Sequence, residues 1–313
     1  MYDARNHSSR PLALGLLLAL LLAVAPALAD TGRDGLVVEL PFELGPRGHV
    51  LVPVSVNGQP PATFAVDTAA SANVINARYA TSLGPALPAG ESVQVEGAHT
   101  STAATMTRFD RLEIGTLTAR ETPAVIMDLS HVEGPDMQLD GLIGAPLLSN
   151  YDVLFDFAAS RLSLYQAGTL AVMGKAASHT VAPIEPGLGH GQIILFGVSF
   201  QDQPLLAVLD TGSGRSGINS PAATALGIDV PAGMAAAHQG GATMHAPRAA
   251  LPSMEIELGD GRLASSTPVA IIDLPVFGPL GLADRPAMLL GTNFLTERRL
   301  GIDYAGSQVY LFD

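Results

Sequence analysis

Two aspartates occupy the same place in two similar stretches of the sequence. Asp67 follows the apolar run Phe64–Val66, Asp210 follows Ala207–Leu209, and a threonine comes directly after each aspartate. Carboxyl groups serve as general acids and bases. Two carboxyl groups held close together cannot both ionise cheaply, so one keeps a proton while the other stays charged. A repeat that supplies one aspartate per copy therefore carries the groups needed for acid–base chemistry.

The similarity of the two stretches continues well beyond the aspartates. Residues 67–84 and 210–227 align without a gap and agree at eight of 18 positions. Further on, matching apolar runs lead into Gly144 and Gly291, which lie 77 and 81 residues after their aspartates. This ordered agreement indicates an internal duplication. The eight shared positions are Asp67/Asp210, Thr68/Thr211, Ile75/Ile218, Asn76/Asn219, Ala80/Ala223, Thr81/Thr224, Leu83/Leu226 and Gly84/Gly227.

Short β-strands are the elements expected to position the two aspartates. Asn57-Gly58 is a hairpin signal, since both residues tolerate a positive φ, and it leads into the strand before Asp67. Leu112–Ile114 and Met254–Ile256 alternate as half-buried strands do. We therefore expect an all-β unit in each copy, with one short helix near its C-terminal end and a final hairpin.

Length and composition limit the possible classes of protein. The chain has 313 residues, enough for two domains, and 48% of them are hydrophobic. Its net charge of −13 argues against a nucleic-acid partner, which requires a cationic surface. The absence of cysteine excludes disulfides, thiol catalysis, cysteine-bound metals and a lipoprotein acceptor. We expect domains at residues 30–168 and 191–313, joined by a linker at 169–190.

The N-terminal segment has the pattern of a signal peptide. Arg5 and Arg10 precede the apolar run Pro11–Val24, and Ala27–Ala29 is an A-x-A cleavage site. We predict a signal peptide at residues 1–29, cleaved after Ala29, and a periplasmic or secreted chain with no stable membrane insertion. An uncleaved anchor is the alternative.

Together these motifs resemble the retropepsin-like aspartic peptidases, in a tandem exported form of bacterial type. The resemblance rests on Asp-Thr-(Gly/Ala) after an apolar strand and on the glycine before a late helix, each found twice. It implies one closed β-barrel per copy, packed as a pseudo-twofold dimer within a monomer. It also implies that Asp67 and Asp210 form a catalytic pair, which hydrolyses peptide bonds in a peptide or protein substrate.

The resemblance assigns roles to the neighbouring residues too. Thr68 and Thr211 would lock the two loops together by hydroxyl hydrogen bonds, and Gly212 would allow a close approach of backbone. The Ser213 hydroxyl would hydrogen-bond to Asp210. No cofactor or metal is required, and the histidine spacing fits no trusted zinc motif. The substrate-binding flaps would comprise His99, Thr100, His238, Gly240 and Gly241.

One departure from the family pattern leaves alternatives open. Ala69 stands where the motif has glycine, and its methyl group could crowd the partner loop or the substrate. One alternative is an inactive protein of the same fold that binds extended peptides. Another is a homodimer in which like copies pair between chains. The other repeated aspartates, Asp156/Asp303 and Asp128/Asp273, are expected to be structural, the latter two as turn caps.

Overall fold

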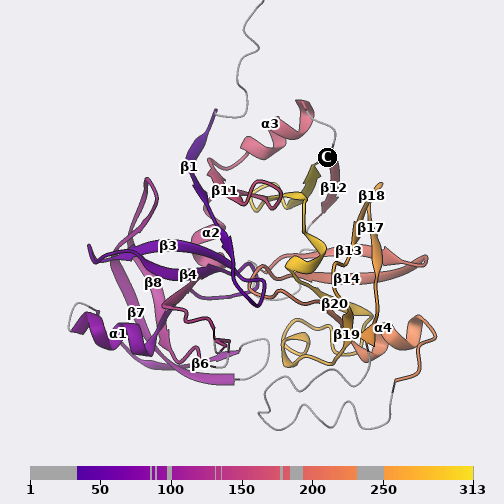
Figure 1. Cartoon of the computed structure of the whole chain (residues 1–313), viewed down its shortest axis with the longest axis horizontal. Helices are drawn as coiled ribbons and strands as arrows, with labels where there is room; N and C mark the ends of the chain where they lie inside the picture. Colours follow the sequence, from indigo (N-terminus) through magenta and orange to yellow (C-terminus); the bar gives the residue numbers. More distant parts are fainter. Residues whose placement is uncertain are drawn as a thin grey trace, which may run out of the picture. The chain divides into compact units, whose positions relative to one another are not determined.

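The computed structural model of the chain is shown in Figure 1. The predicted signal peptide and all five predicted flap residues lie outside the described part. Within that part, no helix is long and apolar enough to cross a membrane. The described residues are 34–84, 87–88, 90–96, 101–130, 132–134, 136–176, 179–183, 193–230 and 250–312.

The first copy folds into a closed barrel of six strands. Its strands pair in the order β3-β4-β9-β5-β8-β7, and β7 pairs back to β3. Every second residue of β3 is buried, which matches the alternation of a strand with one face in the core. The strands are β3 (Val50–Val56), β4 (Ala62–Val66), β5 (Val74–Asn76), β7 (Ser101–Ile114), β8 (Leu117–Met127) and β9 (Gly141–Ile143), with β2 (Glu43–Leu44) and β6 (Ser92–Glu96) beside them.

The second copy repeats this order as an open half-barrel in the described residues. Among the described residues, the counterpart of the 14-residue β7 is two short strands, which are interrupted at Pro252 because proline cannot donate a hydrogen bond to a neighbouring strand. The prediction of tandem all-β units is confirmed, with closure seen in the first. The strands are β13 (Leu195–Phe200), β14 (Gln203–Leu209), β15 (Gly217–Ile218), β16 (Ala250–Leu251), β17 (Glu255–Leu258), β18 (Gly261–Ala264), β19 (Val269–Ile271) and β20 (Ala287–Leu290).

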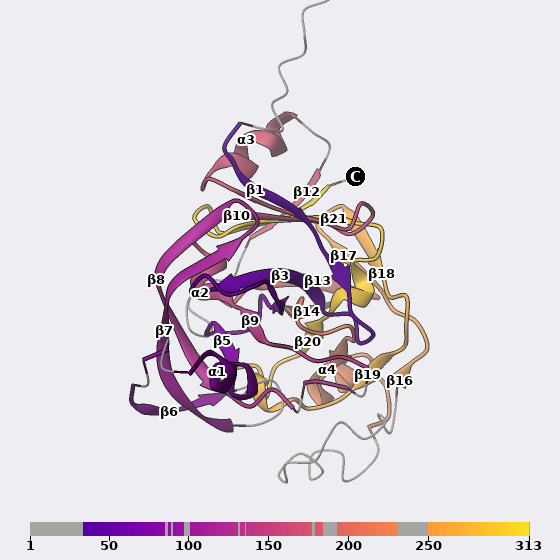
Figure 2. The same cartoon turned by 60° about the vertical axis from the view of Figure 1, so that its left-hand side comes forward.

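A third sheet is built by both copies together (Figure 2). The final hairpin of each copy contributes, and β10 pairs antiparallel with β21. Leu154 pairs with Gly301, its own counterpart in the repeat, so the register is that of an internal twofold. The strands in order are β1 (Leu36–Pro41), β11 (Arg161–Tyr165), β10 (Asp152–Asp156), β21 (Arg299–Asp303), β22 (Gln308–Phe312) and β12 (His179–Pro183).

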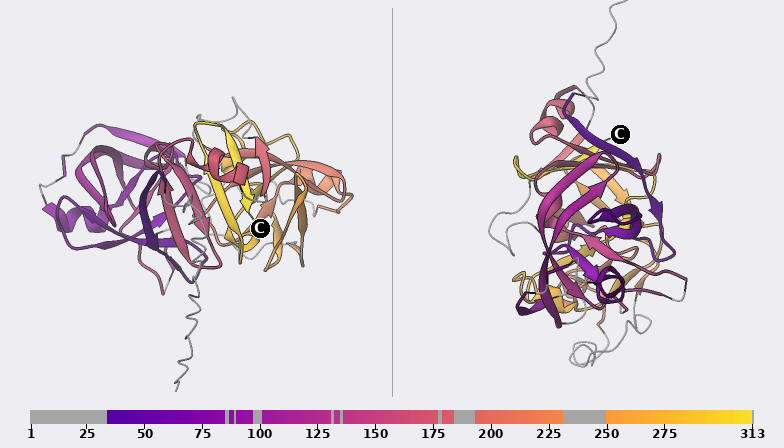
Figure 3. Two further views of the ribbon diagram at one scale, coloured as in Figure 1. Left: turned by 90° about the horizontal axis from the view of Figure 1, so that it is seen from above. Right: turned by 90° about the vertical axis from the view of Figure 1, so that its left-hand side faces the viewer.

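The segment predicted as a linker contributes to this shared sheet. It contains α3 (Thr169–Ala176) and β12, and β12 pairs with β22 as β1 pairs with β11. Viewed from above, α3 lies over the hairpin β21–β22 (Figure 3, left). The Leu170 side chain packs against Gly301 there. The rest of the predicted linker, residues 177–178 and 184–190, lies outside the described part.

Short helices follow each aspartate loop and each late glycine. The late ones are α2 (Ala145–Leu148) and the 3-10 turn η4 (Thr292–Phe294), at the predicted places. The structure adds α1 (Ala77–Leu83), α4 (Ser220–Ala225) and η3 (Pro275–Phe277). Asn76 and Asn219 cap α1 and α4, because each side-chain oxygen accepts a hydrogen bond from a free backbone N–H of the first turn.

Replacing Asn219 should destabilise the second copy. This side chain is buried, accepts from the N–H groups of Ala222 and Ala287, and donates to the carbonyls of Leu282 and Arg285. Asn219→Ala leaves these groups unpaired, so we expect a loss of about 2–4 kcal/mol in urea unfolding. Asn219→Ser retains a capping oxygen and should lose less. Equal unfolding midpoints for all three proteins would contradict this role.

Candidate active site

The loops after β4 and β14 are joined by their threonines. The Thr68 N–H donates to Thr211 Oγ1 (3.2 Å), and the Thr211 N–H donates to Thr68 Oγ1 (3.1 Å). The Thr68 hydroxyl donates to the Leu209 carbonyl (2.8 Å) and the Thr211 hydroxyl to the Val66 carbonyl (2.7 Å). Both threonines are fully buried. Four reciprocal hydrogen bonds therefore fix each loop to the strand of the other copy.

This junction brings Asp67 and Asp210 together. The Asp67 N–H donates to the Ile143 carbonyl and the Asp210 N–H to the Leu290 carbonyl, both at 2.9 Å, so each loop starts from a parallel strand pair. The Asp67 Oδ1 atom accepts from the Ala69 N–H (2.9 Å). The two carboxyl groups lie within hydrogen-bonding reach of each other, since each shifts the pKa of the other. They can therefore share one proton.

The environment makes the two carboxyl groups unequal. Burial raises the pKa of Asp67, while hydrogen bonds from the Ala69 and Ala70 N–H groups and from Asp210 oppose that rise. Burial and then the negative charge of Asp67 raise the pKa of Asp210 well above its usual value. Asp210 Oδ1 is buried and accepts no hydrogen bond, so it is the natural site for the shared proton. Asp67 is then the charged partner.

Gly212 and Ala69, which are equivalent in the repeat, have different surroundings. A Cβ atom on Gly212 would overlap the carboxyl carbon of Asp67, so only glycine fits there. The Ala69 methyl group packs against the apolar cluster of the second copy that includes Leu274 and Phe277. The methyl group therefore has a place in the structure, and the two loops differ in detail.

Ser213 does not play the predicted role. Its hydroxyl donates to the Arg215 carbonyl (2.9 Å), and a hydroxyl has a single proton to donate. The expected bond from the Ser213 hydroxyl to the Asp210 carboxyl group is therefore not formed, although the Ser213 N–H donates to the Asp210 carbonyl (3.3 Å). The residue instead shapes the loop: its own carbonyl accepts from the Thr292 N–H (2.8 Å).

Tyr304 lies close enough to Asp67 to respond to its charge, and it was missed in the sequence. It follows β21, its hydroxyl is buried, and that hydroxyl has no hydrogen-bond partner among the described residues. Burial and then the charge of Asp67 raise the pKa of Tyr304. Phe157 occupies the equivalent place in the first copy, and this difference between the copies is the signal that could have identified it.

The loop between β2 and β3 packs against the loop that follows Asp210 in the second copy. The Gly48 carbonyl accepts from the Thr292 hydroxyl (2.8 Å), and a Cβ atom on Gly48 would overlap Gly214. His49 is buried here, and burial and then the Arg47 charge lower its pKa to about 4, so it is neutral near pH 7. The sequence contains no periodicity that predicts this contact.

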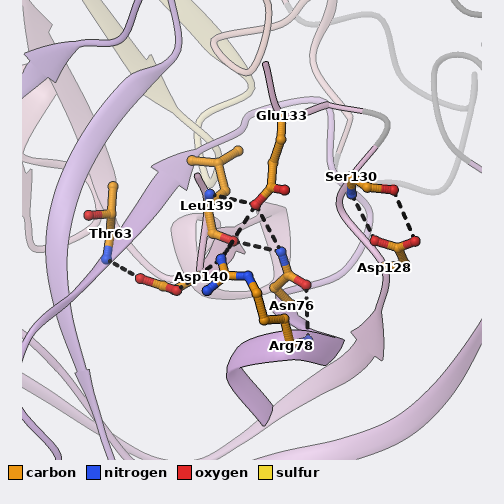
Figure 4. Close-up of polar contacts among 8 residues, drawn as sticks. All are labelled: Thr63, Asn76, Arg78, Asp128, Ser130, Glu133, Leu139 and Asp140. Carbon is orange, nitrogen blue, oxygen red and sulfur yellow. Dashed lines mark hydrogen bonds and ion pairs between the residues drawn. The ribbon is translucent and has the colours of Figure 1, made fainter. Parts of the chain in front are cut away.

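A polar network joins the segment before β9 to β4 and to the start of α1 (Figure 4). The Glu133 carboxylate accepts from the Leu139 N–H (2.8 Å) and from the Asn76 amide (3.1 Å). Asp140 accepts from the Thr63 N–H in β4 (3.0 Å). The segment before β9 is thus hydrogen-bonded both to β4, the strand that leads into Asp67, and to Asn76 at the start of α1.

The other repeated aspartates lie outside this pair. Asp128 accepts from the N–H and hydroxyl of Ser130, which confirms its predicted role as a turn cap (Figure 4), whereas Asp273 accepts from those of Ser220 and so binds the start of α4 instead of capping a turn. Among the described residues, no three His, Asp or Glu side chains converge as metal ligands. The five predicted flap residues lie outside the described part of the chain. They are His99, Thr100, His238, Gly240 and Gly241.

Comparison with known families gives a match in each copy. The family model described as aspartyl protease matches residues 52–147 and 196–294. Together these ranges span more than half of the chain, and each contains one aspartate loop and one late glycine. A search of curated proteins found no match.

Replacing one threonine hydroxyl of this junction by a methyl group should lower the free energy of unfolding strongly. Thr211→Val keeps the shape of the side chain but leaves the Thr68 N–H and the Val66 carbonyl unpaired. We expect a loss of about 2–4 kcal/mol in the free energy of unfolding, measured in urea. Thr211→Ser retains the hydroxyl and serves as the matched control. A valine variant as stable as the serine variant would show that these hydrogen bonds do not hold the junction.

Proposed function

Because the chain belongs to the retropepsin-like aspartyl protease family, we propose that it is an aspartic endopeptidase in which Asp67 and Asp210 activate a water molecule. The main support is the carboxyl pair, within hydrogen-bonding reach of each other and set at the centre of the reciprocal Thr68–Thr211 junction. A family match alone indicates a protease-type function. The carboxyl pair indicates which residues would perform it.

The inequality of the two carboxyl groups assigns their roles in the proposed reaction. Asp67, the charged partner, accepts a proton from a water molecule as that water attacks the carbonyl carbon of the peptide. Asp210, the protonated partner, donates its proton to the carbonyl oxygen. The resulting tetrahedral diol collapses when the C–N bond breaks: Asp67 passes its newly gained proton to the leaving amine, and one hydroxyl group of the diol returns a proton to Asp210. The pair ends with one proton, as it began.

We also propose that the chain works outside the cytoplasm and as a monomer. The N-terminal pattern of basic residues, an apolar run and Ala27–Ala29 supports export after cleavage at Ala29. The junction between Thr68 and Thr211 lies within one chain, which supports a monomer with an internal pseudo-dimer. Extended peptides or unfolded proteins are the proposed substrates.

A second candidate function is peptide binding without cleavage. Ala69 in place of glycine favours it, as does the low exposure of Asp210, which is 5%. In this alternative the same loops would hold an extended peptide, but the pair would not reach its carbonyl carbon. The two functions differ in whether any bond is broken.

Asp210→Asn and Asp67→Asn should each abolish cleavage of a mixed peptide library without unfolding the chain. Either change removes the shared proton, so we expect a loss of at least about 1,000-fold. Wild-type cleavage should fall as pH rises through the raised pKa of Asp210, because the proton donor is then lost. Asp202→Asn, in an exposed turn, is the control. Wild-type protein that binds a statine-type inhibitor but cleaves nothing would favour the binding protein.

The two loop positions should respond differently to exchange of glycine and alanine. Gly212→Ala places a methyl group on the Asp67 carboxyl and should reduce kcat by about 100-fold or more, because reacting groups tolerate little displacement. Ala69→Gly removes a methyl group that already has space, so activity should be retained or raised. Equal effects of the two substitutions on kcat would contradict the asymmetry of the loops.

A further inference from the structure

A second pair of carboxyl groups lies in the shared sheet. Asp152 of β10 and Asp303 of β21 are direct cross-strand partners, and their side chains are 0% and 1% exposed. Directly opposite residues in antiparallel strands point to the same face, with Cβ atoms about 5 Å apart. Two acids therefore meet in a dry environment where the copies join.

The internal twofold makes this pair unusual. Asp303 corresponds in the repeat to Asp156, and Asp152 corresponds to Arg299. The symmetry-related pairing is thus Asp156 with Arg299, an ordinary ion pair with N···O at 3.5 Å. At the other end of the same two strands, an acid replaces the arginine. The Asp152–Asp303 contact therefore needs something other than a cation to balance it.

The hydrogen bonds around the pair leave one carboxyl oxygen of Asp152 unsatisfied. Asp152 Oδ2 accepts from the Leu170 N–H at the start of α3 (2.7 Å), and Asp303 Oδ1 accepts from the Gly306 N–H (2.6 Å). Asp152 Oδ1 is buried and has no partner of good hydrogen-bond geometry, although the Gly168 N–H lies close enough to the carboxyl group to oppose the rise in its pKa. Buried polar atoms are nearly always paired. A proton on Asp152 Oδ1 would supply the missing bond, because the atom could then donate to Asp303.

Among the described side chains, those of the surrounding elements bring no cation to either carboxyl group. Tyr165 on β11 pairs in register with Asp152, and Tyr310 on β22 lies near both acids. Lys175, on α3, is exposed. Arg299 on β21 is occupied by Asp156 and lies over the Phe312 ring. Leu154, Leu170 and Tyr310 belong to the apolar cluster on this face. The pair is therefore enclosed by neutral groups.

We propose that Asp152 and Asp303 form a second proton-binding site, separate from the Asp67/Asp210 pair, whose bound proton holds the two copies and α3 together. With the proton present, one hydrogen bond joins β10 to β21 and Asp152 stays oriented toward Leu170. Without it, two buried negative charges oppose each other across the junction. The proposal does not depend on peptide cleavage.

The direction of the pH effect follows from the burial of Asp152. Burial, assisted by the charge of Asp303, raises the pKa of Asp152 to about 6. The folded chain thus binds this proton more tightly than the unfolded chain, where aspartate ionises near pH ~4. The stabilisation is complete below that pH and is lost as pH rises through about 6. The junction is therefore strongest in acid and weaker near neutral pH.

Asp152→Asn imitates the protonated acid. The amide oxygen accepts from the Leu170 N–H and the amide nitrogen donates to Asp303. At pH 7.5 we expect the unfolding equilibrium constant in urea to be up to about 100-fold smaller for this variant than for the wild type, and similar at pH 4. Asp284→Asn removes the same charge from an exposed loop and should follow the wild type throughout.

Hydrogen exchange at Leu170 reports the site directly. After correction for intrinsic rates, its amide should lose protection between pH 4.5 and 7.5 in the wild type and keep it in Asp152→Asn. Parallel pH profiles of stability for the variant and the wild type would overturn the proposal. If Asp152→Asn does not fold, Asp303→Asn provides the same test, since its amide accepts from Gly306 and donates to Asp152. None of these measurements uses a substrate, so an inactive protein would not affect the outcome.

Discussion

The burial of like-charged groups at a junction between two copies is the constraint on which this structure depends. Each copy supplies an aspartate at the end of an apolar strand, and the twofold arrangement places these carboxyl groups against each other. Buried carboxylates are tolerated only when hydrogen bonds and a shared proton replace their hydration. The Ala69 N–H supplies one such hydrogen bond to Asp67, and the reciprocal Thr68–Thr211 bonds keep the two loops close together.

Backbone symmetry and side-chain asymmetry have separate consequences. The threonine bonds and the β10–β21 register obey the internal twofold, so both copies hold their loops in the same way. The side chains next to the carboxyl pair do not obey it: Ala69 faces an apolar cluster while its equivalent Gly212 meets Asp67. Fusion of two copies in one chain permits such differences, because each position can change independently. An unequal pair of carboxyl groups is the result.

The shared sheet is a second junction at which two carboxyl groups are buried against each other. It joins the final hairpins of both copies and carries α3 on one face. One end of its central strand pair is balanced by an arginine, and the other places Asp152 beside Asp303. Protonation thus affects the molecule at two places, one beside the proposed chemistry and one where the copies are held together.

The sequence alone determined the duplication, the all-β class and the positions of Asp67, Thr68, Asp210 and Thr211, because repeated motifs and strand alternation are local patterns. Only the tertiary structure decided which strands of different copies pair, since a sequence pattern does not state the partner of a strand. Strand pairing placed β12 in a sheet, where the sequence predicted a linker. The tertiary fold also brought Tyr304 close enough to Asp67 for the Asp67 charge to raise its pKa. It also joined Asp152 to Asp303, residues 151 positions apart, whose burial depends on packing that no local signal encodes.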